Sequence, residues 1–398
     1  MFLRNAWYVA GWSGDYGQEL VAQMLLGHRV VLYRKRDGAP VALEDACPHR
    51  KLPLSKGNLK DDVIECGYHG LTFDGSGKCV AAPTQPGQIP EGAVVRSYPV
   101  VDRYRLLWIW MGDPDRANPD DILHIENFDN PDWGCTEGGT LEMECNYLWV
   151  CDNLLDPSHV AWVHVSSFAG AGTDHGQLDL NRTETGVTVS RWIYGQLPSP
   201  YYAGLVKFEG ECDRLQYYEL RIPSIAINKS VYTPAGTGGP DKPLVDKTYI
   251  NMSYNFMTPV DEDNTRYFWF QHRNTDPDDE AVSKFMNDGA HMAFEEDRAG
   301  TVIHGLQQVR DWYKSVRSMS DPEELAEFDI EFAQENLYEL FSADKAALSS
   351  SVPRARNTWA SGWCAPGILV SAPKLPSCAG ARFQVLPPAF NAVCYRIL

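Results

Sequence analysis

The sequence predicts an α+β fold with two domains: an N-terminal all-β domain, then a larger domain in which helices cover an antiparallel sheet. Three observations lead to this prediction. With 398 residues, the chain is long enough to bury two separate cores. Its first 112 residues show short apolar strands and turn signals but no helical period. Beyond them, strands rich in aromatic and β-branched residues alternate with helical patterns.

A hairpin and a final apolar strand define the predicted N-terminal domain. Residues 30–33 and 40–43 are apolar and flank Asp37-Gly38, a pair typical of tight hairpin turns. The last apolar strand is Leu106–Trp110, and a polar, proline-rich linker follows it. We therefore assign residues 1–112 to the first domain.

Alternating helices and strands predict the larger domain. A helical pattern starts at about residue 140 and continues to about residue 165. Aromatic and β-branched strands then follow at 187–192, 215–220, 249–256 and 266–270. A long helix is predicted at about 278–317. We assign residues 113–335 to this second domain.

The C-terminal residues differ in composition from the rest of the chain. Residues 345–398 contain no Asp or Glu, but six Lys or Arg, six Pro and three Cys. This composition predicts a loosely packed appendage rather than a third functional site. We assign residues 336–398 to this atypical C-terminal tail.

Charge and composition argue against several classes of function. The formal net charge is −18, whereas binding to nucleic acid or to an anionic membrane needs clustered Lys and Arg. The sequence contains no run of about 18 apolar residues, so we expect no membrane span. The first residues show no signal-peptide pattern either. Ten cysteines are too few for a disulfide scaffold. We therefore expect a cytoplasmic protein.

Two Cys–His pairs lie in the first domain, with the spacing C-x-H-x16-C-x2-H. Cys47 and His49 form the first pair, and Cys66 and His69 form the second. Two thiolates and two imidazoles could bind one zinc, although zinc sites usually keep like ligands together in the sequence. One Cys and one His from each loop suit a Rieske [2Fe–2S] cluster instead, with the thiolates on one iron and the imidazoles on the other. The alternative is a single zinc ion bound by all four side chains.

A second possible set of metal ligands includes His159 and His164. Their spacing of five residues is one more than the four that align side chains on an ideal helix. Pro157 should disturb the helix here, so that the two rings can converge. Two histidines and one carboxylate would form the facial triad that leaves positions on iron(II) open for dioxygen.

The long helix is the natural source of the carboxylate. Asp297 has small and apolar helical neighbours, whereas Glu295 lies near His291 and Arg298, as a solvated charge would. We expect Asp297 to be the ligand, and substitution of Glu295 or Glu296 to matter far less. The alternative is that any one of these acids is a surface residue.

With these motifs the chain resembles the α subunits of Rieske non-haem iron aromatic oxygenases. Within that family it is similar to the group of vanillate demethylase, dicamba demethylase and phenoxybenzoate dioxygenase. The resemblance covers about residues 4–310. Its matching segments are Asn5 to Ala10, the two Cys–His pairs, Trp108 to Trp110, Asn153 to His164, and Glu296 to Arg298. It implies an N-terminal Rieske [2Fe–2S] domain and a catalytic domain with one mononuclear Fe(II) on His159, His164 and Asp297.

The resemblance also implies an assembly and roles for two more residues. It implies a homotrimer in which Asp156 bridges His69 of one subunit to His159 of its neighbour. Asn153 matches a polar position beside the iron. The chain lacks a dinucleotide fingerprint and a ferredoxin cysteine run, so electrons must come from a separate protein. The resemblance implies an NAD(P)H-dependent flavin and iron–sulfur reductase.

We therefore expect the terminal oxygenase component of a multicomponent system, which uses O2 and electrons from its reductase to oxidise an aromatic substrate. The expected reaction is ether cleavage, the O-demethylation of an aromatic acid, because hydroxylation next to the ether oxygen gives a hemiacetal that falls apart. Alternatives are angular dioxygenation of a diaryl ether such as a phenoxybenzoate, and N-dealkylation. A Rieske-type electron carrier without catalysis is an alternative of another class, but it needs only the first domain.

Overall fold

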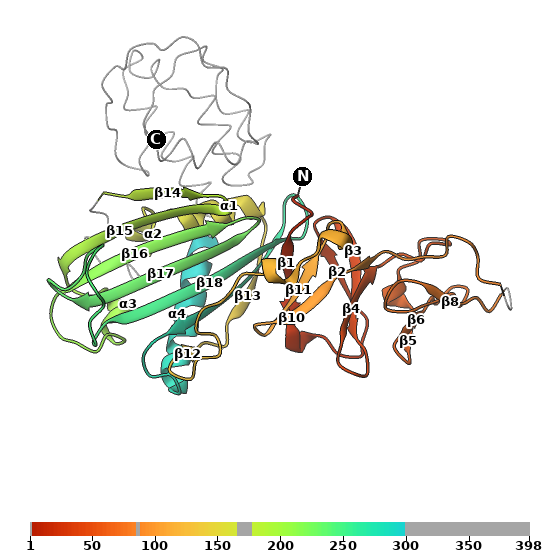
Figure 1. Ribbon diagram of the computed structural model, residues 1–398, viewed down its shortest axis with the longest axis horizontal. Coiled ribbons are helices and arrows are strands. Elements are labelled where there is room, and N and C mark those ends of the chain that lie inside the picture. The colour runs from red at the N-terminus through yellow and green to blue at the C-terminus, as the bar shows by residue number, and fades with distance from the viewer. Residues whose placement is uncertain (1, 85–87, 165–176, 299–398) are drawn as a thin grey trace, which may run out of the picture.

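The computed structural model describes residues 2–84, 88–164 and 177–298, and it confirms the predicted α+β class (Figure 1). An all-β domain comes first, and a larger domain with an antiparallel sheet and helices follows. The domain limits at 112 and 335 stay predictions. The tail at 336–398 lies outside the described residues, as does the part of the predicted long helix after Arg298.

Short strands build the N-terminal domain. They are β1 (Trp7–Trp12), β2 (Val21–Leu25), β3 (His28–Arg34), β4 (Pro40–Glu44), β5 (Asn58–Lys60), β6 (Val63–Glu65), β7 (Thr72–Phe73), β8 (Cys79–Ala81), β9 (Ser97–Tyr98), β10 (Val100–Arg103) and β11 (Leu106–Trp110). Their sheets have the orders β1-β11-β10, β2-β3-β4-β9 and β5-β6-β7-β8. The predicted hairpin is β3-β4, where Gly38 takes the left-handed φ of +87° that the turn requires.

Four short 3-10 helices lie in the connecting segments of the part of the chain that the structure describes. They are η1 (Ser13–Asp15), η2 (Leu54–Lys56), η3 (Pro114–Arg116) and η4 (Pro119–Asp121). The last two form the proline-rich linker, and each begins with proline after a side-chain cap, from Asp113 and Asn118 respectively.

A large antiparallel sheet forms the second domain. Its strands are β12 (Gly134–Cys135), β13 (Gly139–Met143), β14 (Asp179–Thr183), β15 (Gly186–Gln196), β16 (Cys212–Arg221), β17 (Ile225–Pro234), β18 (Tyr249–Pro259) and β19 (Thr265–Arg273). They are ordered β12-β19-β18-β17-β16-β15-β14, and β13 also pairs with β19. The helices are α1 (Tyr147–Leu155), α2 (Val160–Val163), α3 (Pro200–Ala203) and α4 (Glu280–Arg298). Figure 1 shows α4 crossing one face of the sheet.

The two faces of this sheet differ in character. One face is apolar and packs against the N-terminal domain in a shared core, where the Trp108 ring meets that of Phe256 edge-on at 5.4 Å. The other face packs against α1 and α4, and its middle carries buried polar side chains such as Gln216, Ser253 and Asn255. Gln216, Ser253 and Asn255 all form hydrogen bonds, and Asn228 beside them donates to the carbonyl of Leu154, so this polar region lies next to the end of α1.

The prediction and the structure differ in several elements of the second domain. The prediction of a helix from about residue 140 was wrong, because residues 139–143 form β13, in which buried Leu141 and Met143 alternate with exposed neighbours. The helix starts after Asn146, whose side chain accepts a hydrogen bond from the Leu148 N–H at 3.1 Å. Strand β17 was missed because its centre is polar. Within the described residues, no helix is both long and apolar enough to cross a membrane.

Candidate functional site

A break between two helices positions His159 and His164. Helix α1 ends at Leu155, and α2 begins only at Val160, so the disturbance predicted from Pro157 is confirmed. The two histidines flank α2, one before its first residue and the other after its last. Their ring centroids lie 5.3 Å apart. The break thus brings together two rings that a continuous helix would turn apart.

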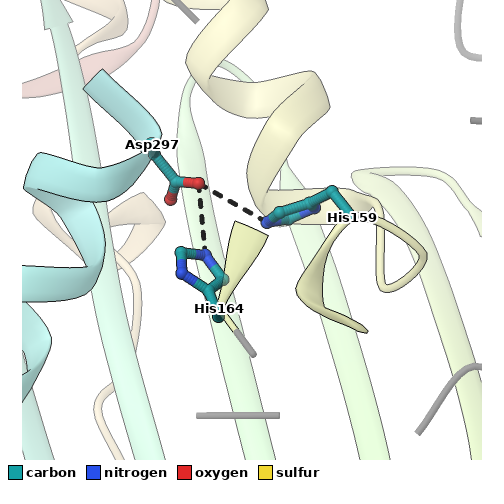
Figure 2. Close-up of side chains that lie close together, drawn as sticks. All are labelled: His159, His164 and Asp297. Carbon is teal, nitrogen blue, oxygen red and sulfur yellow. Dashed lines mark ion pairs between the residues drawn. The ribbon is translucent and has the colours of Figure 1, made fainter. Parts of the chain in front are cut away.

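The last turn of α4 places Asp297 between these rings (Figure 2). Its Oδ1 lies 3.2 Å from His164 Nε2 and 3.7 Å from His159 Nε2, and the three donor atoms all lie within 4.8 Å of one another. Two metal–ligand bonds of about 2.1 Å at a right angle separate their donor atoms by about 3 Å. The three side chains therefore fit a single metal ion in the facial arrangement typical of non-haem iron.

Glu296 supports this group in a way that the sequence did not reveal. The His164 Nδ1 lies 2.8 Å from Glu296 Oε2, so a ring whose Nε2 faces the site can donate its other N–H to this carboxylate. Burial lowers the pKa of His164, but the hydrogen bonds that its ring donates to the Asp297 and Glu296 carboxylates, together with their negative charge, outweigh burial and raise that pKa above its usual value. Glu296 therefore contacts one of the three residues of the site, and the expectation that its substitution matters far less than that of Asp297 stays a prediction. By contrast, Glu295 pairs with Arg298 at 2.6 Å and lies toward solvent.

Asn153 and Asp156 lie on either side of the end of α1. The Asn153 amide donates to Asp297 Oδ1 at 3.4 Å, which places it beside the three ligands. Asp156 instead accepts hydrogen bonds from Ser158, at 2.8 Å from its N–H and 2.6 Å from its hydroxyl. His159 Nδ1 is buried, and no described residue forms a hydrogen bond with it.

The two Cys–His pairs sit in loops with the same backbone pattern. In each loop the Cys N–H donates to the carbonyl five residues on, from Cys47 to Leu52 at 2.9 Å and from Cys66 to Leu71 at 2.8 Å. The fourth residue after each Cys donates back to the Cys carbonyl and takes a left-handed φ, +57° at Lys51 and +73° at Gly70. This common turn presents each Cys–His pair in the same way.

Burial divides the four side chains into an inner and an outer pair. Cys47 and Cys66 are buried, and burial raises the pKa of the Cys47 thiol, which lies close to Cys66. His49 is exposed, and its ring centroid lies 4.6 Å from that of half-buried His69. Two thiols inside and two imidazoles outside match a [2Fe–2S] cluster with one buried and one exposed iron. Figure 1 shows strands β5 to β8, which adjoin these loops, at the end of the domain farthest from α1 and α2.

Comparisons with known proteins decide the family. Residues 6–99 match the Rieske [2Fe-2S] domain, and residues 143–329 match the Vanillate O-demethylase oxygenase C-terminal domain. The toluene-4-sulfonate monooxygenase system iron-sulfur subunit of Comamonas testosteroni is 41% identical over 320 residues, which cover 78% of this chain and 91% of that relative. The chain belongs to the Rieske non-haem iron oxygenases.

Two further relatives define this Rieske oxygenase more closely. The vanillate O-demethylase oxygenase subunit of a Pseudomonas species is 33% identical over 303 residues, 75% of this chain and 84% of that relative. Dicamba monooxygenase bound to 3,6-dichlorosalicylic acid has a TM-score of 0.70 at 30% identity, covering 79% of this chain and 90% of that chain. Another structure of that enzyme contains non-haem iron and dicamba, with a TM-score of 0.60 at 29% identity.

The similarity decides between the expected classes of function. This Rieske oxygenase carries a [2Fe–2S] cluster and a mononuclear non-haem iron. It is the oxygenase component of a multicomponent system that needs a separate reductase. Zinc and an electron carrier without catalysis, the alternatives left open by the sequence, are therefore wrong.

Proposed function

We propose that His159, His164 and Asp297 hold the mononuclear iron, and that Cys47, His49, Cys66 and His69 hold the cluster. The convergence of the two histidines and Asp297 at 3.2 to 3.7 Å is the observation that supports the catalytic role. When bound, the iron supplies dioxygen activation, and the cluster supplies single electrons. Glu296 orients the His164 ring, and Asn153 holds Asp297 Oδ1 with its amide.

The proposed reaction is the O-demethylation of a methoxy-substituted aromatic acid. One oxygen atom of O2 enters a methyl C–H bond, and the other leaves as water after uptake of two electrons and two protons. The resulting hemiacetal releases formaldehyde and a phenol. The similarity to the vanillate O-demethylase subunit supports this reaction.

A second candidate is hydroxylation of a methyl group attached directly to the ring. The toluene-4-sulfonate monooxygenase subunit is 41% identical to this chain, and toluene-4-sulfonate has a ring methyl group and no ether. The same first step, insertion of oxygen into a methyl C–H bond, would then give a stable benzylic alcohol. Angular dioxygenation would instead give a ring-hydroxylated product, and N-dealkylation would give an amine.

The proposed assembly is a head-to-tail homotrimer in the cytoplasm, fed by an NAD(P)H-dependent flavin and iron–sulfur reductase. The cluster loops and the iron ligands belong to different domains of one chain, which favours electron transfer between subunits (Figure 1). In this assembly we expect Asp156 to join His69 of one subunit to His159 of the next, and the buried Nδ1 of His159, which has no partner among the described residues, supports this role.

A substrate panel with a surrogate reductase tests the proposed reaction. The panel contains 4-methoxybenzoate, toluene-4-sulfonate, 3-phenoxybenzoate and an N-methylaniline, with products identified by mass spectrometry. Formaldehyde and 4-hydroxybenzoate in equal amounts are expected from the first compound. Turnover of only the phenoxybenzoate, or of only the amine, would replace the proposed reaction with that alternative.

A further inference from the structure

Arg214, on β16, is a buried arginine that has no acidic partner within the described part of the chain. Arg214 is 5% exposed, and its buried Nε forms no hydrogen bond with any described residue. Among the described residues, none forms a hydrogen bond or an ion pair with its guanidinium. The adjacent acid cannot serve, because Asp213 accepts hydrogen bonds from Gly195 N–H and Gly238 N–H at 3.2 and 2.9 Å. A guanidinium stays charged even when buried, so its isolation is energetically costly.

Two aromatic rings fix the position of this guanidinium. Its central carbon lies 5.1 Å from the ring centroid of Tyr232 and 5.6 Å from that of Tyr202. The two rings lie only 4.5 Å apart themselves, and both are buried. Arg214 is therefore held rigidly, which reduces the entropy lost when it binds a ligand.

Two buried hydroxyls lie on the Tyr232 side of Arg214, that of Tyr232 itself and that of Ser199 beside it. The hydroxyls of Tyr232 and Ser199 are buried and lie close to each other, and neither has another hydrogen-bond partner among the described residues. Native structures rarely leave buried polar atoms unpaired, and an unseen ion or ligand is a common reason. A guanidinium can only donate, and the neighbouring hydroxyls can donate as well, so the group that best complements them is an acceptor with negative charge.

This group lies on the sheet face that carries the proposed iron site. Along β16, Arg214, Gln216 and Tyr218 alternate onto one face, and Gln216 donates to the Tyr218 hydroxyl at 3.3 Å. Gln216 also accepts from Arg191 at 2.6 Å, and Arg191 donates to the carbonyl of Pro157, two residues before His159. Four residues of strand separate Arg214 from Tyr218, about 13 Å.

We infer that Arg214, with the hydroxyls of Ser199 and Tyr232, binds the carboxylate or sulfonate of an aromatic substrate whose reacting group lies toward His159, His164 and Asp297. This inference rests on the proposed function, since it names the group that orients the aromatic acid in the same site. A guanidinium forms two parallel hydrogen bonds with either oxyanion, so Arg214 selects anionic aromatic compounds over neutral ones of the same shape.

Calorimetric titration of the holoenzyme tests this inference without turnover. The probes are benzoate and benzenesulfonate, with benzamide as a neutral control for shape. Arg214→Met should weaken binding of both anions roughly 100-fold while changing benzamide binding far less. Arg214→Lys keeps the charge but not the two parallel donors, so its affinity for the anions should lie between those of the wild type and Arg214→Met. Arg221→Met is the matched control, because Arg221 is on the same strand but pairs with Glu219 and is 40% exposed.

Thermal unfolding separates a binding role from a structural one. Without ligand, Arg214→Met should melt at a higher temperature than the wild type, because it removes an unpaired buried charge. A lower melting temperature combined with unchanged anion binding would overturn the inference, and so would a wild type that binds neither anion. If the wild type binds benzoate through Arg214 but forms no product from 4-methoxybenzoate or toluene-4-sulfonate, the proposed function is wrong and the anion site stands.

Discussion

Substitution of Glu296 is the sharpest test of how the chain holds its iron. In Glu296→Ala, the His164 ring loses the carboxylate that lies 2.8 Å from its Nδ1. The His164 side chain is only 5% exposed, so water does not readily replace this carboxylate. The ring then loses its fixed orientation, and its Nε2 becomes a poorer donor to the metal.

The size of the effect follows from the kind of contact. A hydrogen bond to a charged group contributes about 1.5–3 kcal/mol, and the 26% exposure of the Glu296 side chain argues for the lower half of that range. At about 1.4 kcal/mol for each tenfold change, we expect iron affinity to fall roughly 10-fold, within the range of 10- to 100-fold seen for such partners. Glu296→Gln, whose amide oxygen still accepts, should lose less.

Competition with a chelator for Fe(II), or for Co(II) as a stable substitute, measures this affinity. The matched control is Glu295→Ala, which removes the preceding carboxylate of the same helix, one that pairs with Arg298 instead. Cluster absorbance should be the same in both variants. If Glu296→Ala binds the metal as tightly as Glu295→Ala does, Glu296 does not orient His164 and the reasoning is refuted.

Three further predictions concern the cluster, the electron path and the shared core. Cys47→Ala should lose the visible absorption and the reduced-state paramagnetic signal of the cluster, and a normal [2Fe–2S] signal would reject the ligand assignment. Asp156→Asn should keep both metals and the trimer but slow single-turnover product formation by orders of magnitude, whereas an unchanged rate, or an active monomer by light scattering, would remove the intersubunit path. Trp108→Ala should lower the free energy of unfolding by about 3–5 kcal/mol in urea titrations, because this fully buried ring joins the two domains. A loss below about 1 kcal/mol would show that the domains do not share this core.

Local patterns allowed much of the site to be predicted. The two Cys–His pairs and the break at Pro157 are encoded within short segments, and their geometry follows from turn and helix chemistry. The environment of Asp297 on one helix also distinguished it from Glu295. Such features depend on neighbours in the sequence, so they can be read without a structure.

The features that were missed depend on contacts between distant segments. Glu296 meets His164 across 132 residues, and no local pattern distinguishes it from a surface acid. The isolation of Arg214 is visible only once Tyr202 and Tyr232 enclose it. Strand β17 was missed because Asn228 and Ser230 interrupt its apolar run, and the same polar side chains belong to the sheet face of the site. Polar residues on the sheet face of the site thus interrupted the apolar pattern from which a strand is predicted.

Metal analysis of Asp297→Ala tests the central claim most directly, that one chain holds two iron centres on separate ligand sets. Iron and acid-labile sulfide are measured in the purified wild type and the variant, with the reduced-state paramagnetic spectrum of each. The wild type should contain more iron than sulfide, because the mononuclear iron brings no sulfide with it. Asp297→Ala should contain equal amounts and an unchanged cluster spectrum. A variant that keeps the excess iron, or that loses its cluster with it, would contradict the account.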